Sequence, residues 1–417
     1  MKYLKSLCLF LCFALLLPLA GCSTLRSFKL VDKGEARFAF VLPGNAPAQV
    51  LYARDKLLYF VQSKLGVTPV EDASACKYRV LLGNTGEKKS TKLAETLGEN
   101  EYALCVDGKD LVVVAKSDAF LYDAIAALLQ SDKLRLDSEG GSLTLSGSTE
   151  LRAAGDLTSV RYLFTQGSTL TSKSAHYITM ENPEGLGSEQ GGCFDGTYYY
   201  QAFLKKHSAS DEDQNIVKIA KYDYKTKTPV ACSEELALNH CNDITYNPKT
   251  GELLVANNNP NRRRVSVLSA ETLQLLRTVE IDAMIYGITY DSGRDRFAVA
   301  LSSSQNMRIL NADLSLADDK VFLGTELTKS YTTQGICSDD TFIYHVLWDG
   351  ERKSKPTFQN VITVYDWYGS FVGVIDIGIG IIEPENISID ENGKFMIVAS
   401  TKSGAALYEI ELTGLAG

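Results

Sequence analysis

The stretch QGGCFDGTYYYQAF, which begins at Gln190, returns in altered form as QGICSDDTFIYHVLW, which begins at Gln334. Aligning the two places Asp195 on Asp339. Three more segments fit the same register: CNDITYN ending at Asn247, YGITYD ending at Asp291 and ENISID ending at Asp390. These five aligned residues, called the anchors below, follow one another at spacings of 52, 44, 48 and 51 residues. A period of about 50 residues in strand-rich sequence predicts a β-propeller with one four-stranded blade per repeat.

Each anchor is followed by apolar segments of strand length. The fullest copy, NPKTGELLVANNNPNRRRVSVLSAETLQLLRTVEI (247–281), resembles the YVTN-type propeller repeat, and this resemblance implies a fold without a function. The last copy ends after its third strand, near Leu412, so we expect an earlier strand such as SVRYLFTQ (159–166) to complete the final blade. A further blade within residues 167–190 would raise the number of blades from five to six. The sequence therefore predicts an all-β propeller of five or six blades over residues 155–414.

A different pattern precedes the propeller. Alternating strands and amphipathic helices fill residues 36–150, with a hairpin signal at Asp107-Gly108, and predict a small α/β (α+β) domain. With its motifs LLGNTG, EYALCVDGKDLVVVA and AFLYDAIAALLQ, this segment resembles the non-catalytic domain that precedes the barrel in bacterial α-glucuronidases and β-hexosaminidases. In those families the domain carries no catalytic residues. No barrel pattern follows here, so the resemblance implies a carbohydrate context and no glycosidase activity.

The first residues predict export. A basic start with Lys2 and Lys5 leads into an apolar run that ends in Leu19-Ala20-Gly21-Cys22. This ending resembles the bacterial lipobox, in which the cysteine becomes the lipidated first residue. The resemblance implies a signal peptide over residues 1–21, a lipid anchor on Cys22 and a tether over residues 22–35. We therefore expect a bacterial, membrane-anchored, extracytoplasmic lipoprotein at the cell surface; an ordinary secretory signal with a chance cysteine is the alternative.

Charge and composition exclude several classes of partner. The formal charge of −9 would become −11 without Lys2 and Lys5, which argues against nucleic acid. The basic run 262–264 predicts a solvated hairpin tip, with a phosphate site as the alternative. No P-loop, dinucleotide fingerprint or metal-ligand spacing is present in the sequence, so we expect no cofactor and no metal. Six cysteines remain after Cys22, and most fit free buried thiols; Cys232 and Cys241 are close enough in sequence to consider a disulfide.

The repeat register separates structural positions from candidate site positions. Two residues before each anchor the side chain is small, as expected where the innermost strands crowd near the propeller axis. Cys193 and Cys337 occupy this position, so we interpret them as core thiols, and we predict no catalytic residue. Five residues before each anchor the side chain is polar: Gln190, Asn242, Tyr286, Gln334 and Glu385.

Two further polar residues, His240 and Glu383, lie two positions earlier than Asn242 and Glu385, and on a strand each would share a face with its partner. We predict that these seven residues surround one mouth of the central channel and bind the ligand. Polar residues that merely line a water-filled channel are the alternative. The predicted function is a non-catalytic, ligand-binding propeller that takes a glycan, another small polar ligand or a protein partner. The alternative is a hydrolase or lyase acting on a carbohydrate or lactone, with His240, Glu383 or Glu385 as acid or base.

Overall fold

The structure is a computed structural model that describes residues 27–179, 187–206, 210, 215–301, 305–349, 360–379, 382–390, 393–401 and 404–416. The chain divides into two compact units. The first comprises the chain up to Val50 together with Lys64–Ala154, and the second comprises Leu51–Ser63 together with Gly155–Gly417. Cys22 and the signal segment lie outside the described residues. Among the helices that are described, none combines the length and hydropathy that a membrane span requires.

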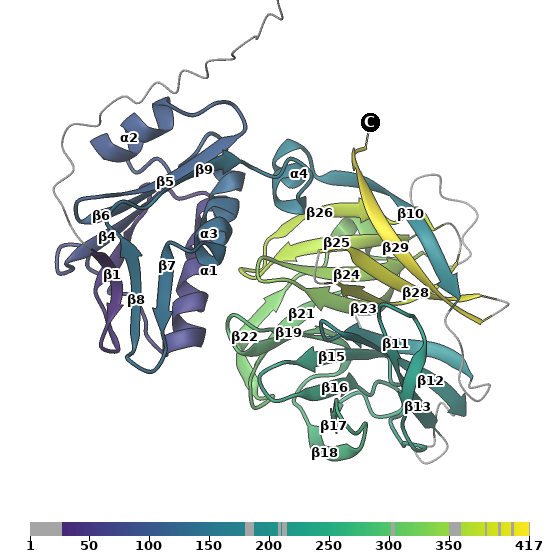
Figure 1. The fold of residues 1–417 in the computed structure, drawn as a ribbon. Helices are drawn as coiled ribbons and strands as arrows, with labels where there is room; N and C mark the ends of the chain where they lie inside the picture. The colour runs from purple at the N-terminus through teal and green to yellow at the C-terminus, as the bar shows by residue number, and fades with distance from the viewer. Residues whose placement is uncertain are drawn as a thin grey trace, which may run out of the picture. The chain divides into compact units, whose positions relative to one another are not determined.

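The first unit is built on a mixed sheet with strand order β3-β4-β6-β5-β9 (Figure 1). Its strands are β3 (Phe38–Val41), β4 (Tyr78–Leu82), β5 (Glu101–Asp107), β6 (Asp110–Ala115) and β9 (Glu150–Ala154). β3, β4 and β6 are parallel, and β5 forms the expected hairpin with β6. Helices α2 (Lys88–Glu95) and α3 (Leu121–Gln130) pack on this sheet. Leu93 and Ala94 of α2 cover Val112 and Val114 of β6.

Residues 27–35, which fall within the predicted tether, take part in a second small sheet. β1 (Ser27–Asp32) pairs with β8 (Ser142–Ser146), and β2 (Glu35–Ala36) and β7 (Leu134–Asp137) complete a second small sheet. The sequence SFKLVD places Phe28 and Leu30 on one face, and both side chains are fully buried. The tether prediction is therefore wrong for residues 27–35, because this short run has enough apolar residues to form a strand once β8 is present as its partner.

The second unit contains three four-stranded sheets and one eight-stranded sheet, which consists of two sets of four strands joined where β10 meets β26; together they form the five blades of a β-propeller. Blade 1 is β11 (Ser188–Phe194), β12 (Tyr198–Lys206), β13 (Ile216–Asp223) and β14 (Pro229–Cys232). Blade 2 is β15 (Asp243–Asn247), β16 (Glu252–Ala256), β17 (Arg264–Ser269) and β18 (Leu275–Glu280). Blade 3 is β19 (Ile285–Asp291), β20 (Arg296–Leu301), β21 (Met307–Asn311) and β22 (Leu316–Phe322). Blade 4 is β23 (Thr332–Ser338), β24 (Phe342–Trp348), β25 (Asn360–Asp366) and β26 (Phe371–Asp376). Blade 5 is β27 (Pro384–Ile389), β28 (Phe395–Thr401), β29 (Gly404–Leu415) and β10 (Thr169–Thr179).

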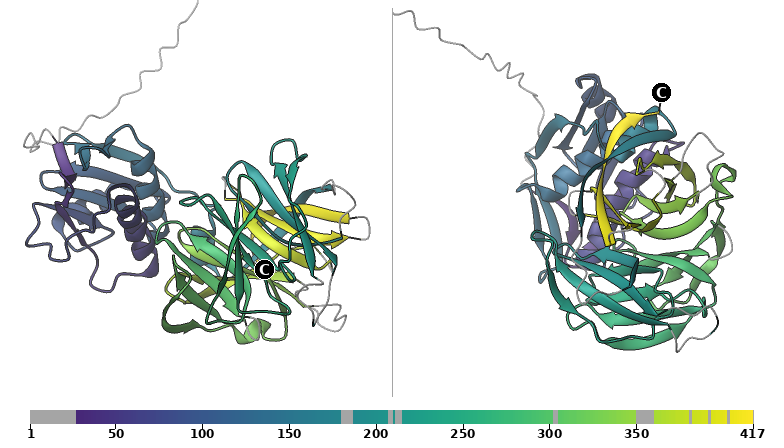
Figure 2. Two further views of the ribbon diagram at one scale, coloured as in Figure 1. Left: turned by 90° about the horizontal axis from the view of Figure 1, so that it is seen from below. Right: turned by 90° about the vertical axis from the view of Figure 1, so that its right-hand side faces the viewer.

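The ring closes by pairing an early strand with the last one, as Figure 2 shows for the teal β10 beside the yellow β29. The expected segment, residues 159–166, is not that strand. Val160–Gln166 forms helix α4, and the hydroxyl of Ser159 caps it by accepting a hydrogen bond of 3.2 Å from the Tyr162 amide. β10 closes blade 5 instead, and Thr169–Thr171 also pairs in parallel with β26 of blade 4. Because β10 is used in this way, the described residues contain five blades and no sixth.

The anchors explain why the sequence repeats. Oδ1 of Asp195 accepts hydrogen bonds from the amides of Thr197 and Tyr198, at 2.8 and 2.6 Å. Oδ1 of Asp339 accepts two equivalent hydrogen bonds, and the remaining anchors, Asn247, Asp291 and Asp390, each accept at least one in the same turn. Each anchor therefore fixes the turn between the innermost strand and the second strand of its blade.

The innermost strands meet around Asp243, which is fully buried at the start of β15. Its Oδ2 accepts hydrogen bonds of 3.0 Å from the amides of Ile288 in blade 3 and Ile336 in blade 4. Its Oδ1 accepts one of 3.1 Å from its own neighbour Ile244. One side chain thus joins three blades across the propeller axis. Burial raises the pKa of Asp243 well above its ordinary value, while the three amide donors act in the opposite direction.

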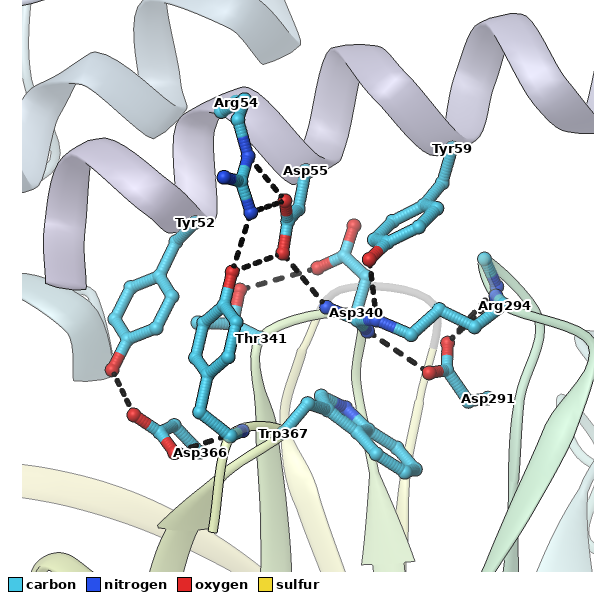
Figure 3. Close-up of polar contacts among 12 residues, drawn as sticks. Tyr52, Arg54, Asp55, Tyr59, Asp291, Arg294, Asp340, Thr341, Asp366 and Trp367 are labelled. Carbon is cyan, nitrogen blue, oxygen red and sulfur yellow. Dashed lines mark hydrogen bonds and ion pairs between the residues drawn. The ribbon is translucent and has the colours of Figure 1, made fainter. Parts of the chain in front are cut away.

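A second set of contacts lies at the anchor end of the blades, on segment Leu51–Ser63 of helix α1 (Ala48–Leu65), which belongs to the second unit (Figure 3). The side chains pair as Tyr52 with Asp366 at 3.0 Å, Asp55 with Arg294 at 3.0 Å, and Arg294 with Asp291 at 2.9 Å. Asp55 and Asp291 are both buried. Since these charged groups are bonded to one another, we assign them to structure rather than to a ligand site.

We expect Asp243→Ala to destabilise the protein by about 2–6 kcal/mol, because the amides of Ile288 and Ile336 in the two other blades would each lose their buried acceptor at about 1–3 kcal/mol. Asp243→Asn keeps an acceptor oxygen and should cost less. Chemical denaturation of the full chain measures both, with the fully exposed Asp319→Ala as the control. A loss no larger than that of the control would contradict the bridging role.

The same carboxyl has a defined effect on the pH dependence of stability. Its folded-state pKa lies above that of an unfolded aspartate, so its contribution is greatest at low pH and declines as pH rises through the folded-state pKa. In Asp243→Asn, the free energy of unfolding should lack this pH-dependent contribution, and denaturation at several pH values measures the difference.

Candidate functional site

Residues of different innermost strands contact one another when their positions in the register differ by one. Asp243, four before its anchor, bonds to the amides of Ile288 and Ile336, three before theirs, and the Tyr290 amide donates to Thr245 Oγ1 at 3.1 Å. The five innermost strands therefore begin at the same end of the ring, which we call the mouth. The polar residues five before each anchor lie at this end.

Four of these five residues lie in or beside a β-bulge. The pairing register shifts between Glu189 and Gly192, between Ile285 and Gly287, between Thr333 and Ile336, and between Pro384 and Asn386. These shifts enclose Gln190, Tyr286, Gln334 and Glu385 respectively. A bulge adds one residue to a strand and re-aims its side chain, so these residues do not follow the simple alternation of a regular strand.

Three blades contribute side chains with direct contacts at the mouth. Gln334 Nε2 donates a hydrogen bond of 2.8 Å to Glu383 Oε1, which joins blade 4 to blade 5. Asn258 Nδ2 donates one of 3.2 Å to Asn242 Oδ1 within blade 2. These contacts, together with the interactions of Tyr286 given next, define the mouth cluster: Asn242, Asn258, Tyr286, Gln334, Glu383 and Glu385.

The pKa of the Tyr286 phenol in blade 3 depends on the charges of the cluster. Burial raises the pKa of its phenol, and the charges of Glu385 and Glu383 raise it further. Arg262 and a hydrogen bond with the Asn258 side chain act in the opposite direction. Burial also raises the pKa of Glu383, while its hydrogen bond from Gln334 opposes this. Tyr286 therefore lies within electrostatic reach of side chains from blades 2 and 5.

Two of the sequence-predicted residues are placed differently. The Nε2 of Gln190 donates to the neighbouring carbonyl of Glu189 at 2.5 Å, and its own carbonyl accepts from Asn386 Nδ2 at 2.8 Å. His240 lies in a turn before β15, where its amide donates to the carbonyls of Asn257 and Asn259. Glu383 likewise precedes β27. The argument that His240 and Glu383 share a strand face with Asn242 and Glu385 is therefore wrong, although Glu383 still reaches the cluster.

Buried amide groups near the mouth have polar atoms without a hydrogen-bond partner among the described residues. They include Asn242 Nδ2 and Asn258 Oδ1, on side chains only 3% and 1% exposed. The first is a donor and the second an acceptor, and the two amides are bonded to each other. A buried polar atom without a partner costs about 1–3 kcal/mol, so such a pair calls for a ligand or bound water.

Sequence reasoning missed two kinds of residue. Asn258 and Arg262 lie in the loop between β16 and β17, which the register of the innermost strands does not cover. Position four before the anchor was also missed, although its pattern was available: Gly191, Asp243, Gly287, Gly335 and Asn386. Three glycines and two hydrogen-bonding side chains in one register position indicate crowding at the axis.

Other candidate chemistry is not supported. The described residues contain no group of three or more His, Cys, Asp or Glu side chains placed to hold a metal ion. The six described cysteines, including Cys232 and Cys241, are free. Burial raises the thiol pKa of Cys193 and Cys337 well above its usual range, which disfavours the nucleophilic thiolate. In the basic run, Arg263 pairs with Asp282 at 2.7 Å and Arg264 with Glu280 at 3.3 Å, so the run does not present a free phosphate site.

Comparison with solved structures gives β-propeller domains of low similarity. The Cps50 (Swd1) β-propeller domain of Myceliophteria thermophila aligns at 13% identity and a TM-score of 0.32, over 55% of this chain and 65% of its own length. The WD40 repeats of RRP9 align at 10% identity and a TM-score of 0.35, over 59% of this chain and 86% of theirs. No protein-family model and no curated protein matches the chain. The propeller assignment rests on the ring of sheets itself.

The titration of Tyr286 tests the geometry of the cluster. We expect its pKa to exceed the ordinary value of 10.0 and to fall in Glu383→Gln and in Glu385→Gln, because each change removes a nearby negative charge. NMR of ¹³Cζ-labelled tyrosine follows the titration, with Tyr286→Phe to assign the signal. The exposed Glu411→Gln is the control. If neither glutamate variant moves the pKa of Tyr286, the cluster does not exist as described.

Proposed function

We propose that this protein is a surface-exposed bacterial lipoprotein whose propeller binds a hydroxyl-rich ligand, such as a glycan, at the mouth cluster. The observation that carries the proposal is the pair of buried, unpartnered amide atoms on Asn242 and Asn258. Around them the cluster supplies donors from Gln334, acceptors from Glu383 and Glu385, and the ring and hydroxyl of Tyr286. Such a mixture of donors, acceptors and an aromatic ring suits a polyol.

The absence of chemical symmetry supports binding over packing. The anchors are Asp or Asn in every blade because each performs the same task. The mouth positions instead carry an amide, a phenol and a carboxylate in different blades. Packing around a near-symmetric axis would favour similar residues, whereas recognition of an asymmetric ligand needs different ones.

Catalysis is the second candidate, and the raised pKa of Glu383 favours it. A carboxyl group that keeps its proton at higher pH is a suitable general acid, and Glu385 offers a second carboxyl as base or nucleophile. The substrate would be a carbohydrate or a lactone. Turnover of chromogenic glycosides or lactones that Glu383→Gln abolishes would establish the enzyme; saturable binding without turnover supports the binding protein.

Binding itself can be tested with an array of plant, fungal and bacterial oligosaccharides and the full-length protein in detergent. For the glycan that binds, we expect Asn242→Ala to weaken binding by about 1–3 kcal/mol, because a buried hydrogen bond to the ligand is lost. Circular dichroism should show an unchanged fold. Gln274→Ala, at an exposed position of blade 2, is the matched control. Equal affinities for both variants would remove the mouth cluster from the binding site.

The anchor is tested separately. We expect Cys22 to incorporate a palmitate analogue in bacterial cells and to hold the protein in the membrane fraction, since two or more acyl chains give stable membrane attachment. Cys22→Ser should abolish both labelling and membrane retention. A labelled, membrane-bound Cys22→Ser protein would show that the lipobox resemblance is misleading.

A further inference from the structure

The propeller axis is closed one residue further along the innermost strands than the polar positions at the mouth. The residues four before each anchor, one from each blade, form what we call the axial layer: Gly191, Asp243, Gly287, Gly335 and Asn386. Asp243 Oδ2 accepts its 3.0 Å hydrogen bond from the Ile336 amide of blade 4. Blades 2 and 4 are not neighbours in the ring, so this bond crosses the axis.

The other members of the axial layer pack closely around this bond. A Cβ at Gly335 would lie 3.2 Å from Asp243 Oδ1, and one at Gly287 would lie 3.3 Å from Cγ1 of Ile336. Asn386 Nδ2 of blade 5 donates to the Gln190 carbonyl of blade 1 at 2.8 Å. Asp243 and Asn386 are both fully buried. Atoms from all five blades therefore fill the axis at this layer, and a sugar ring cannot pass it.

The unpartnered amide atoms of the mouth cluster lie next to this layer. Asn242 directly precedes Asp243, and Asn258 bonds to Asn242 at 3.2 Å. Asn242 Nδ2 and Asn258 Oδ1 are buried, so a ligand group that bonds to them must reach in from the mouth. Such a group cannot continue toward the anchor end of the blades, because the axial layer blocks the way.

We infer that the mouth cluster binds the terminal sugar of a glycan chain rather than an internal segment; this inference rests on the glycan binding proposed above. A terminal sugar can bond to Asn242 and Asn258 while the rest of its chain extends away from the mouth in one direction. An internal sugar continues into the chain at two positions. Both continuations would have to turn back toward the mouth, since neither can cross the axial layer.

The test compares chain lengths. Glucan, mannan, galactan, xylan and fructan chains of about 6 and about 60 sugars are titrated into the full-length protein in detergent, and calorimetry gives the association constant per mole of chain. We expect this constant to agree within about twofold between the two lengths, because every chain has one terminus of a given kind. Internal binding would instead raise it about tenfold, in proportion to the number of internal positions.

Two further measurements locate the site. Cyclodextrins and cyclic β-glucans have no chain terminus, so they should neither bind saturably nor compete with a bound linear chain. Asn242→Ala and Asn242→Asp should each weaken binding of both chain lengths by the same factor. The aspartate variant keeps the acceptor for Asn258 and removes only the unpartnered donor. Gln274→Ala should leave both affinities unchanged.

The outcomes separate the two proposals. An association constant per chain that rises about tenfold with length, or saturable binding of a cyclic glucan, overturns the preference for chain termini and leaves the proposed glycan binding standing. Folded Asn242 variants that bind the linear chains as tightly as the unmodified protein remove the mouth cluster from the site and overturn both proposals. If no chain of either length gives saturable binding, the proposed function is rejected and the terminal preference with it.

Discussion

The hydrogen bonds that the Asp243 carboxyl group accepts hold the centre of the propeller. Five strands that converge on an axis leave little room for side chains. Asp243 supplies an acceptor to two other blades at once, through 3.0 Å bonds to Ile288 and Ile336. Since an unpaired buried amide is costly, this one carboxyl group stabilises the ring by supplying an acceptor to two buried amides of other blades.

The glycines of the same register position follow from this arrangement. A Cβ at Gly191 would lie 2.5 Å from the Cα of Asp243, and one at Gly287 would lie 2.9 Å from its Oδ2. A Cβ at Gly335 would lie 2.9 Å from the Cα of Asn386. These glycines are required by close approach rather than by a left-handed backbone, since none of them has a positive φ. Asn386 is the second polar group at the axis: its Nδ2 donates to the Gln190 carbonyl and its Oδ1 accepts from the Tyr199 hydroxyl at 3.0 Å.

The sequence predicted the features that repeat in every blade, but it did not predict the features that differ between blades. The anchors were readable because an Asp or Asn side chain that bonds the following amides leaves the same mark in every blade. Residues 159–166 were misread because Val160, Tyr162 and Phe164 alternate as in a strand, and the helix they form instead depends on the Ser159 cap. The repeat register identified the candidate residues at the mouth. The direction in which each side chain points depends on β-bulges, and no residue type in the sequence predicts these bulges. Asn258 lies in a loop, where register has no meaning.

The crowding of residues at the propeller axis is linked to the variety of polar side chains at the mouth. At the level of Asp243 and Asn386 the side chains satisfy backbone groups of other blades, so selection there serves closure of the ring. One residue earlier, the bulges release Tyr286, Gln334 and Glu385 from the sheet pairing, so their side chains are no longer committed to a ladder position. The residue four before the anchor must therefore be a glycine or a side chain that bonds to another blade. The residue five before the anchor can differ in size and charge between blades, and the ring still closes. Position five thus combines freedom from the demands of ring closure with proximity to unpaired amide atoms, and both features support the ligand site proposed above.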